Sequence, residues 1–481
     1  MIKIIVLLLQ TILGQITFRD IPYVYTSSTN NISDIIDFAN SDTVRILVLG
    51  DSQETCPGGA GIYYIPYLNY ELYLRTGNVP ETPLSTIGSF SGDWLLRGAA
   101  ANPGIFPSRL SSSQRAPNFG GMSTYSLGSS QNYGQLLMLQ HDAADVNSQT
   151  NIQGLHNYFN PNNNVYLEVV GATNINSGEI TVDVKPTNSN VTNYFRNITQ
   201  TFTSNIGLQS SQYETKSFFA GPLNFNNQPY LQVEISGTSN SVPTDIIGAR
   251  FISSNSVGYA TTSFSMGGYT SWHVLQNHSN CQTIISAVDP DIVWITYGAN
   301  DAAAGNGLTP SQFKFNLLQL IAFTRNACNK PDLNIVLIPD SYATTMIGTK
   351  YTYWEQYVPI CVEIANELDY ITVINSCRFM YEHGLNESTY SNYLSDGVHY
   401  NPYGARIKSE SEINILYTLE NICNPDLNND GNIDQDDVIT LIDIIGGYNP
   451  NNIDGDLNND GNLDQDDILL LIDIISGGQC I

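Results

Sequence analysis

Basic residues are scarce in this chain of 481 residues, which has 18 lysines and arginines against 45 aspartates and glutamates. The formal net charge is −27. Because so negative a chain repels phosphate, this composition argues against a nucleic acid as partner. Apolar residues still make up 42% of the chain, which is enough for a sizeable packed core.

Long apolar runs are also missing, apart from 1-MIKIIVLLLQTILGQ-15 at the N-terminus. This run follows an early lysine and is too short to span a bilayer, which is typical of a secretory signal peptide. We therefore expect residues 1–15 to be cleaved near Gly14 or Gln15, and the protein to be secreted, without a membrane span. A buried N-terminal strand is the alternative interpretation.

Cysteine is limited to seven residues, an odd number. In a secreted protein this predicts some disulfides and at least one free thiol. Cys423 and Cys480 flank an acidic tail and would connect its ends, and Cys361 and Cys377 are close enough in sequence to pair. Spacing alone leaves the connectivity open. In a eukaryotic host, glycosylation sequons would be read at Asn31, Asn190, Asn197, Asn277 and Asn386.

Apolar runs alternate with helix-like segments before residue 100 and again after residue 256. Buried strands are predicted at 44–49, 258–266, 290–298, 333–340 and 370–375. Helices are predicted at 61–77, where Pro66 must lie in the first turn or kink the helix, at 310–328 and at 352–368. This alternation predicts a parallel, doubly wound α/β sheet in a domain split between residues 40–100 and 256–420.

The period changes between these two halves. Alternating, strand-like runs separated by turn residues occur at 164–172, 178–186, 229–237 and 245–253. They predict a small β-sandwich of about a hundred residues. The preceding stretch, about 100–163, is rich in Gly, Ser, Asn and Pro and is predicted to be mostly loop. Residues 101–255 therefore form a module inserted between the first and second strands of the α/β domain.

Polar motifs follow three of the predicted α/β strands, in 44-VRILVLGDSQETCPGG-59, 265-SMGGYTS-271 and 297-YGANDA-302. A fourth motif, 395-SDGVHYNPYGA-405, precedes the last helix of this domain. Chemistry in an open α/β sheet collects at the carboxyl ends of its strands. We therefore expect the four motifs to lie together.

These motifs contain what hydroxyl nucleophilic catalysis requires. Ser52 would become a nucleophile if a base removed its proton, and His399 can be that base. Asp396 can hold the tautomer of the imidazole and stabilise its positive charge. Donors for the developing oxyanion would be the backbone N–H groups of Ser52 and Gly268 and the side-chain amide of Asn300, each worth about 3 kcal/mol.

The four motifs, in this order, resemble those of the SGNH hydrolases, also called the GDSL esterase/lipase family. The resemblance covers roughly residues 44–100 and 256–420, and it implies an SGNH hydrolase fold and a serine esterase that needs no cofactor for catalysis. Asp51 is then structural support and not the acid of the triad. Gly120 and Gly121 are alternatives to Gly268 as the glycine of the second motif. We favour Gly268 because its loop lies between two predicted strands at ordinary βαβ spacing.

A β-rich insert after the first motif is similar to the arrangement in bacterial cell-wall O-acetylesterases, where it resembles a carbohydrate-binding module. This implies a carbohydrate O-acetylesterase. A GDSL-type lipase or short-chain ester hydrolase is the alternative, and an inactive carbohydrate-binding protein attached to a scaffold is another. Only β alternation supports a sugar-binding insert, so a purely structural insert is nearly as plausible.

The tail, residues 424–481, is a duplicated unit without lysine or arginine, because 426-DLNNDGNIDQDDVITLIDIIGG-447 recurs as 456-DLNNDGNLDQDDILLLIDIISG-477. Each copy begins with Asp-x-Asn-x-Asp-Gly, has an aspartate at loop position 12 and continues into an apolar helix. This is the oxygen spacing that Ca²⁺ requires, with the glycine permitting a sharp turn. The expected ligands are Asp426, Asn428, Asp430, Asn432, Asp434 and Asp437 in the first loop, and Asp456, Asn458, Asp460, Asn462, Asp464 and Asp467 in the second.

Position 12 is Asp where a full EF-hand has Glu, and no helix precedes either loop. With the duplication, these departures resemble a type I dockerin, a module that docks onto cohesin domains of a scaffold protein. The resemblance implies a small all-α domain, two structural calcium ions, a cohesin partner and an acetylated polysaccharide as substrate. The expected apolar docking face comprises Val438, Leu441, Ile442, Leu470 and Leu471.

Overall fold

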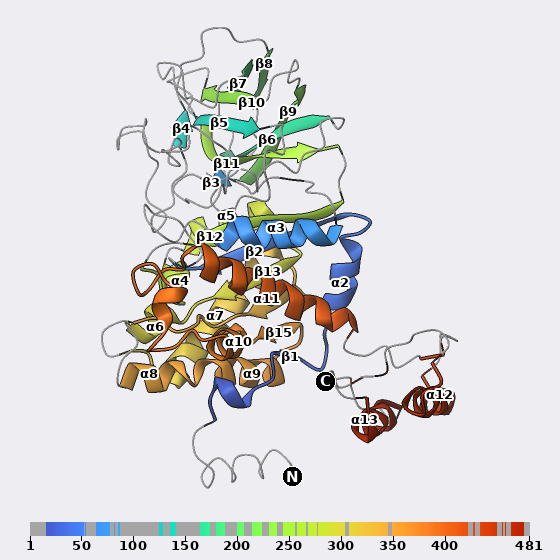
Figure 1. Cartoon of the computed structure of the whole chain (residues 1–481). Coiled ribbons are helices and arrows are strands. Elements are labelled where there is room, and N and C mark those ends of the chain that lie inside the picture. The colour runs from blue at the N-terminus through green and yellow to red at the C-terminus, as the bar shows by residue number, and fades with distance from the viewer. Residues whose placement is uncertain are drawn as a thin grey trace.

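The structure is a computed structural model of the whole chain (Figure 1). The residues that it describes are 16–51, 53, 64–76, 81, 85–86, 125–127, 135–140, 164–173, 179–187, 200–205, 214–223, 230–237, 244–254, 257–265, 268–276, 278–303, 307–344, 349–421, 427–428, 433–449, 455, 457 and 463–475. The predicted signal peptide, residues 1–15, lies outside these ranges. So do Ser52, Cys56, Cys423 and Cys480.

A six-stranded sheet is the centre of the α/β part (Figure 1). In spatial order its strands are β1 (Val24–Thr26), β15 (Ile371–Ile374), β14 (Asn334–Leu337), β13 (Ile292–Thr296), β2 (Thr43–Gly50) and β12 (Gly258–Ser265). The five strands from β15 to β12 are parallel, as predicted. The short edge strand β1 is antiparallel to β15 and was not predicted.

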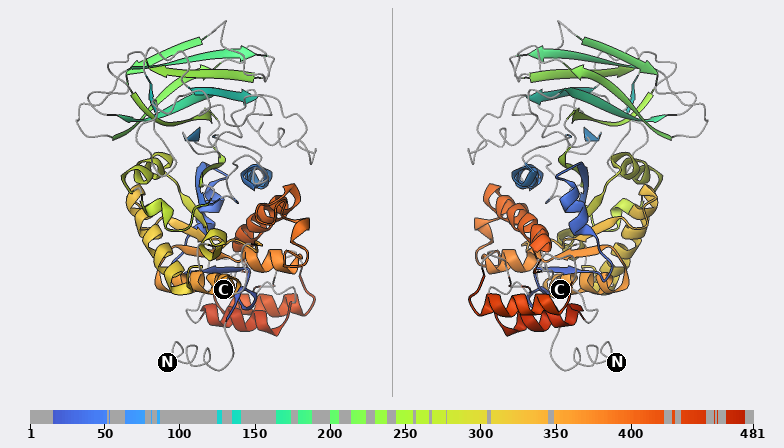
Figure 2. Two further views of the ribbon diagram at one scale, coloured as in Figure 1. Left: turned by 90° about the vertical axis from the view of Figure 1, so that its left-hand side faces the viewer. Right: turned by 90° about the vertical axis from the view of Figure 1, so that its right-hand side faces the viewer.

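Helices cover both faces of this sheet (Figure 2). On one face lie α5 (His278–Val288), α7 (Pro310–Cys328) and α9 (Tyr357–Glu367), and on the other lie α2 (Ile32–Phe38), α3 (Tyr64–Thr76), α10 (Ser376–Glu382) and α11 (Pro402–Asn421). Shorter elements are α4 (His273–Gln276), α6 (Ala299–Ala303), α8 (Thr349–Trp354) and the 3₁₀ turns η1 (Phe18–Asp20) and η5 (Tyr390–Asn392).

Two helix predictions can be compared with these bounds. Helix α3 begins at Tyr64, so Pro66 lies in its first turn, the first of the two placements considered, where a missing N–H is tolerated. The helix predicted at 352–368 is in fact two helices, α8 and α9. Pro359 lies in the first turn of α9, so the helix starts again at Tyr357, where a proline can be accommodated.

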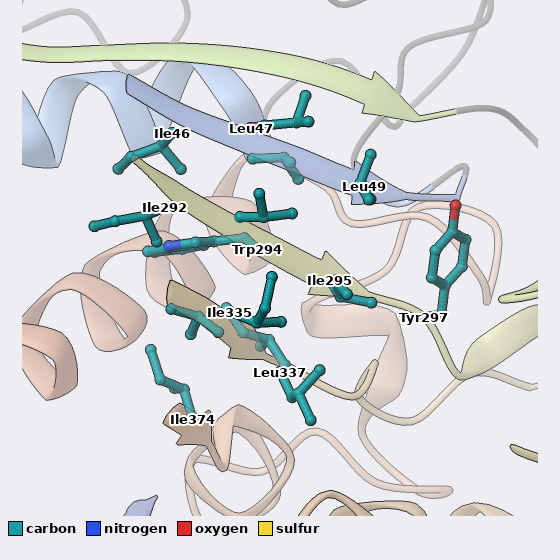
Figure 3. Close-up of a cluster of buried hydrophobic side chains, with 14 of the residues drawn as sticks. Ile46, Leu47, Leu49, Ile292, Trp294, Ile295, Tyr297, Ile335, Leu337 and Ile374 are labelled. Atoms are coloured by element: carbon teal, nitrogen blue, oxygen red, sulfur yellow. The ribbon is translucent and has the colours of Figure 1, made fainter. Parts of the chain in front are cut away.

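The core of the α/β part lies between the sheet and its helices (Figure 3). Every residue of β13 is buried, and Leu47 and Trp294 have no exposed surface. Parallel strands that are covered on both faces need apolar side chains in both directions, which explains the uninterrupted apolar runs of β2 and β13. These runs fix the strands whose ends carry the predicted motifs.

Two antiparallel sheets form the inserted part, layered at the top of Figure 2. One contains β5 (Gln135–Gln140), β10 (Tyr230–Gly237), β7 (Glu179–Thr187) and β8 (Gln200–Asn205). The other contains β3 (Ser85–Thr86), β11 (Thr244–Ser253), β6 (Val165–Thr173), β9 (Glu214–Leu223) and β4 (Tyr125–Leu127).

The four strands predicted in the insert are confirmed as β6, β7, β10 and β11. Strands β8 and β9 were missed, and β4 and β5 lie in the stretch predicted to be mostly loop. Strand β3, within the segment 40–100 assigned to the α/β domain, pairs with β11 of the insert. Except for β8, which pairs with the preceding strand β7, their pairing partners are distant in sequence, so local patterns indicate them weakly.

Four charged side chains, which we call the Glu81 cluster, join the insert to the α/β part. Arg45 of β2 donates to both oxygens of Glu81, from Nη2 to Oε1 at 2.7 Å and from Nε to Oε2 at 3.1 Å. Arg250 of β11 contacts Glu81 Oε2 through Nη1 at 3.0 Å and Glu168 Oε2 of β6 through Nε at 2.5 Å. Glu81, Glu168 and Arg250 are each at most 5% exposed. Two positive and two negative charges therefore compensate one another at a buried junction.

Apolar and backbone contacts strengthen this junction. Val170 of β6 belongs to the same buried core cluster as the α/β sheet. The backbone of Glu81 forms an isolated antiparallel β-bridge with Ile252 of β11. The insert is therefore packed against the α/β part and is not merely tethered to it.

Cys361 and Cys377 are both buried free thiols, so the disulfide considered between them is wrong. The Cys377 thiol instead lies 3.0 Å from the Pro339 carbonyl and 3.1 Å from that of Asp340. Burial raises the pKa of both thiols, which keeps them protonated and unreactive. The predicted pair of Cys423 and Cys480 lies outside the described residues.

Two short helices follow the repeated loops of the tail, α12 (Gln435–Ile445) and α13 (Gln465–Ile475). Their core consists of Leu427, Leu441, Leu457 and Leu471, four residues that correspond pairwise in the repeat. Leu441 and Leu471 are fully buried there, so the prediction that they belong to an exposed docking face is wrong. Among the described residues, no helix has both the length and the apolar character needed to cross a membrane.

The Glu81 cluster predicts a large effect of one conservative substitution. Glu81→Gln should lower the free energy of unfolding by about 3 kcal/mol, because it leaves two arginines with one counter-charge at a buried site. Glu363→Gln is the matched control, since that carboxylate is 50% exposed in its pair with Lys314 and should contribute under about 1 kcal/mol. Urea unfolding of both variants checks this. Equal losses in the two would contradict it.

Candidate active site

The strands β12, β2 and β13 end on one line across the sheet. Gly50, the last residue of β2, lies opposite Ser265 of β12 on one side and Thr296 of β13 on the other. In Figure 3, Leu49 and Tyr297 mark the corresponding ends of β2 and β13. The residues that follow these strands therefore begin as neighbours, as expected for the carboxyl edge of a parallel sheet.

Asp51 occupies the centre of this edge and is fully buried. Its Oδ1 accepts a hydrogen bond from the backbone N–H of Gln53 at 2.8 Å, and its Oδ2 accepts one from Nδ2 of Asn300 at 2.8 Å. Both carboxylate oxygens are thus committed to holding other groups in place, which fits the prediction of a supporting role. Ser52, the predicted nucleophile, stands between Asp51 and Gln53 in the sequence and lies outside the described residues.

Asn300 connects two of the predicted motifs. From the start of α6 its Nδ2 donates to Asp51 Oδ2 and also to the backbone carbonyl of Tyr269, at 3.0 Å. Both amide hydrogens are therefore in use in the structure. For Asn300 to stabilise an oxyanion as predicted, the oxyanion would have to replace one of these two acceptors.

Gly268 lies on the loop that Asn300 holds through Tyr269. Its φ of +80° belongs to the left-handed region that glycine adopts readily, and it is exposed. A Cβ at this position would meet no atom within 4 Å, so the backbone conformation and not space favours glycine. The structure therefore brings Gly268, Asn300 and Asp51 to one edge. The alternatives Gly120 and Gly121 lie outside the described residues.

Asp301 is a buried residue to which the sequence analysis gave no role. Its carboxylate accepts hydrogen bonds from Ser271, from the hydroxyl at 2.5 Å and from the backbone N–H at 3.1 and 3.2 Å. Complete burial raises the pKa of Asp301 to about 6, although the hydrogen bonds from Ser271 oppose the increase. The motif 298-GAND-301 contained this residue, but only the fold shows what it contacts.

Asp396 and His399 form a hydrogen-bonded pair, as predicted. Asp396 Oδ2 lies 2.7 Å from His399 Nδ1, and Asp396 Oδ1 accepts the backbone N–H groups of Val398 at 3.0 Å and His399 at 2.8 Å. Partial burial by itself would raise the pKa of Asp396, but the hydrogen bonds from His399 and Val398 outweigh it and hold the pKa at about 2. Since Nδ1 faces the carboxylate, Nε2 is the ring nitrogen left for proton transfer.

The loop that carries this pair is fixed to the segment after β14. The backbone N–H of Thr344 donates to the carbonyl of Gly397 at 2.8 Å. Gly397 has a φ of +85°, and a Cβ there would lie 2.6 Å from Thr344 Oγ1. Only glycine fits so close an approach in this conformation. The sequence analysis did not identify Thr344, because nothing in its local pattern indicates this contact.

The predicted calcium ligands are partly described. Asp437 and Asp467, at loop position 12, are fully buried. Asp437 accepts the backbone N–H groups of Asn428 at 3.2 Å and Asp434 at 2.9 Å, and Asp467 accepts that of Asp464 at 2.9 Å. In the described part of the chain no group of three or more metal-binding side chains is found. The other ligands lie outside it: Asp426, Asp430, Asn432, Asp456, Asn458, Asp460 and Asn462.

The carboxyl edge of the sheet and the Asp396–His399 pair are the described parts of the candidate site, and they can be compared with known families. Residues 236–407 match the model of the GDSL-like Lipase/Acylhydrolase family. This segment contains Gly268, Asn300, Asp396 and His399. The match supports a GDSL-type acylhydrolase, an ester hydrolase, over this segment. No curated protein matches the sequence.

Several solved structures are similar. That of a peptidoglycan O-acetylesterase has a TM-score of 0.51 and 15% identity, and the alignment covers 84% of this chain and 100% of the other. A family two carbohydrate esterase from Clostridium thermocellum, in complex with cellohexaose, has a TM-score of 0.26 and 12% identity over 53% of this chain and 91% of that one. A lipase/acylhydrolase from Enterococcus faecalis has a TM-score of 0.26 and 22% identity over 33% and 75%. The first likeness shows a common fold.

The Asp396–His399 pair predicts the effect of removing one charge. Asp396→Asn should lower kcat by about 10⁴-fold, because an amide NH₂ facing Nδ1 selects the wrong tautomer of His399. The protein should stay folded, since the amide oxygen can still accept the two backbone N–H groups. Hydrolysis of p-nitrophenyl acetate and thermal unfolding measure the two effects. A folded variant with more than a tenth of the wild-type kcat would refute the role of Asp396.

Proposed function

We propose that this chain is a secreted serine esterase that removes O-acetyl or other short acyl groups from polysaccharide and is attached to a scaffold by its tail. The observation that carries this proposal is the 2.7 Å contact between Asp396 and His399, on a loop fixed to the carboxyl edge of a GDSL hydrolase sheet. The motif that contains Ser52 directly follows β2, whose end is the centre of that edge.

In the proposed reaction Ser52 Oγ attacks the ester carbonyl while His399 Nε2 takes its proton. Asp396 stabilises the resulting imidazolium, and its low pKa keeps it ionised throughout. The oxyanion is bound by donors from Ser52, Gly268 and Asn300. His399 then gives its proton to the departing sugar oxygen, which leaves as a hydroxyl group. Water activated by the same histidine releases acetate from the acyl-enzyme.

Polysaccharide is the proposed substrate for two reasons. The solved structure with which the chain shares its fold over 84% of its length is named a peptidoglycan O-acetylesterase. The tail, with its resemblance to a dockerin, is expected on enzymes that attack insoluble polysaccharide. The first reason supports acetyl esters of a glycan, and the second supports a polymeric substrate outside the cell.

The tail is proposed to be a calcium-binding dockerin. In the first copy the carboxylate at position 12, Asp437, reaches back to the backbone of Asn428 at position 3, as a ligand that closes a loop must. The partner face must be revised because Leu441 and Leu471 are core residues. Ile439 and Ile442 on α12, with Leu469 and Ile472 on α13, are 46% to 57% exposed and correspond pairwise in the repeat. We propose these four as the cohesin-binding face.

The catalytic proposal is tested by acetate release from acetylated xylan, acetylated pectin and O-acetylated peptidoglycan, beside long-chain acyl esters. We expect the wild type to release acetate, and Ser52→Ala and His399→Ala to lower kcat by about 10⁴-fold or more. Ser41→Ala, which changes an exposed serine just before β2, at the opposite end of that strand from Gly50, is the control. Preference for long-chain esters would favour the lipase alternative, and an inactive wild type would refute the esterase.

The tail proposal predicts that calcium stabilises α12 and α13, because the clustered carboxylates repel one another without a cation. Calcium at about 100 times its Kd should add about 2.7 kcal/mol per site. Calorimetry of the full chain in calcium and in excess chelator measures this. Asp437→Asn with Asp467→Asn should abolish the difference, whereas Asp443→Asn on the exposed face of α12 should keep it. Chelation should leave acetate release intact; lost activity would place a metal in the hydrolase instead.

A further inference from the structure

A carboxylate without a cation is buried beside the candidate oxyanion site. Asp301 has no exposed surface, and among the residues that the structure describes none forms an ion pair with it. Its acceptor capacity is directed at one residue, Ser271, through three hydrogen-bond contacts. Burying a charge in this way is unfavourable unless strong hydrogen bonds compensate it, and the raised pKa of Asp301 shows that they do so only in part.

Ser271 is the far end of the loop that carries Gly268. The start of α6 holds this loop at two points, since Asn300 binds the carbonyl of Tyr269 and Asp301 binds Ser271. A third contact comes from α7, where Nδ2 of Asn316 donates to Ser271 Oγ at 3.1 Å. The backbone from Tyr269 to Ser271 is thus fixed relative to Asn300.

Packing does not fix Gly268 itself. It is exposed, and no atom lies within 4 Å of the position its Cβ would take. Its position therefore depends on the backbone that follows it, which the hydrogen bonds of Tyr269 and Ser271 hold. Donors aimed at a developing charge contribute only if they are held in place before the reaction.

We propose that Asp301 is a positioning residue of the oxyanion site, whose buried carboxylate fixes the Gly268 loop relative to Asn300. This inference rests on the proposed esterase function and adds a residue to it. A carboxylate suits the task because hydrogen bonds to an ionised acceptor are roughly twice as strong as neutral ones. An amide at this position would offer one acceptor and turn its NH₂ group toward the N–H of Ser271.

The test compares Asp301→Asn with Asp291→Asn in the full chain. Asp291 directly precedes β13, whereas Asp301 follows that strand. The Oδ2 of Asp291 accepts the backbone N–H of Arg45 at 2.9 Å, and burial raises the pKa of Asp291 as it does that of Asp301. It lies at the amino end of the strand, away from the site. With p-nitrophenyl acetate, Asp301→Asn should lower kcat by about 10- to 100-fold and change KM by no more than about twofold, because misplacing a reacting group by about 1 Å can cost 10²-fold. Asp291→Asn should keep the wild-type kcat.

A second measurement separates positioning from loss of stability. A phenylboronic acid forms a tetrahedral anion on a serine hydroxyl, so its Ki should rise in Asp301→Asn by the same factor by which kcat falls. A purely structural role would lower the melting temperature of both variants and leave Ki and the kcat of the folded protein unchanged.

If Asp301→Asn does not fold, Ser271→Ala decides the matter. It removes the hydroxyl donor to Asp301 and keeps the backbone N–H, and kcat should fall several-fold at constant KM. If a folded Asp301→Asn or Ser271→Ala variant has the kcat and Ki of the wild type, the positioning role is overturned and the proposed esterase function is unaffected. A wild-type chain that turns over no ester would overturn the esterase itself, and the positioning role with it.

Discussion

The register of three parallel strands determines where the polar groups of the candidate site can lie. Gly50 faces Ser265 on one side and Thr296 on the other, so the chain leaves the sheet at three adjacent points. A slip by one residue would turn every apolar side chain of β2 or β13 to the opposite face. Because the strands are buried on both faces, their register is fixed by how the side chains pack against the surrounding core. Trp294 is the largest of these fully buried side chains. The contact between Asp51 and Asn300 depends on this alignment.

Three carboxylates organise the site, and their surroundings separate their chemistry. Asp396 has a pKa of about 2 because hydrogen bonds stabilise its charge, whereas burial raises that of Asp301 to about 6. Between these values Asp396 is ionised while Asp301 takes up a proton. Asp51 holds Asn300 from the side of β2. In the proposed mechanism Asp396 serves proton transfer, whereas Asp51 and Asp301 hold groups in position, a division that residue type alone does not reveal.

Sequence patterns predicted the parts of this fold that local physics determines. Continuous apolar runs identified β2 and β13, and the motif 396-DGVH-399 identified a pair that is indeed hydrogen-bonded. The edge strand β1 was missed because its three residues gain their strand conformation from β15, far away in sequence, and β8 was missed because its residues are mostly polar. The contact of Asp301 with Ser271 spans 30 residues, and the burial of Leu441 depends on the second repeat of the tail. Such facts come from tertiary packing.

The Glu81 cluster makes the insert a poor candidate for transplantation between hydrolases. Cutting the chain at Asn164 and Ser254 would remove Arg250 and Glu168 together, one positive and one negative charge of the cluster, and would uncover Arg45 and Glu81. That remaining pair would become a solvent-exposed ion pair and contribute little. Loss of Val170 would also open the side of the main core. A graft at this position therefore has to supply both charges and an apolar side chain, so the junction restricts which modules the hydrolase can accept.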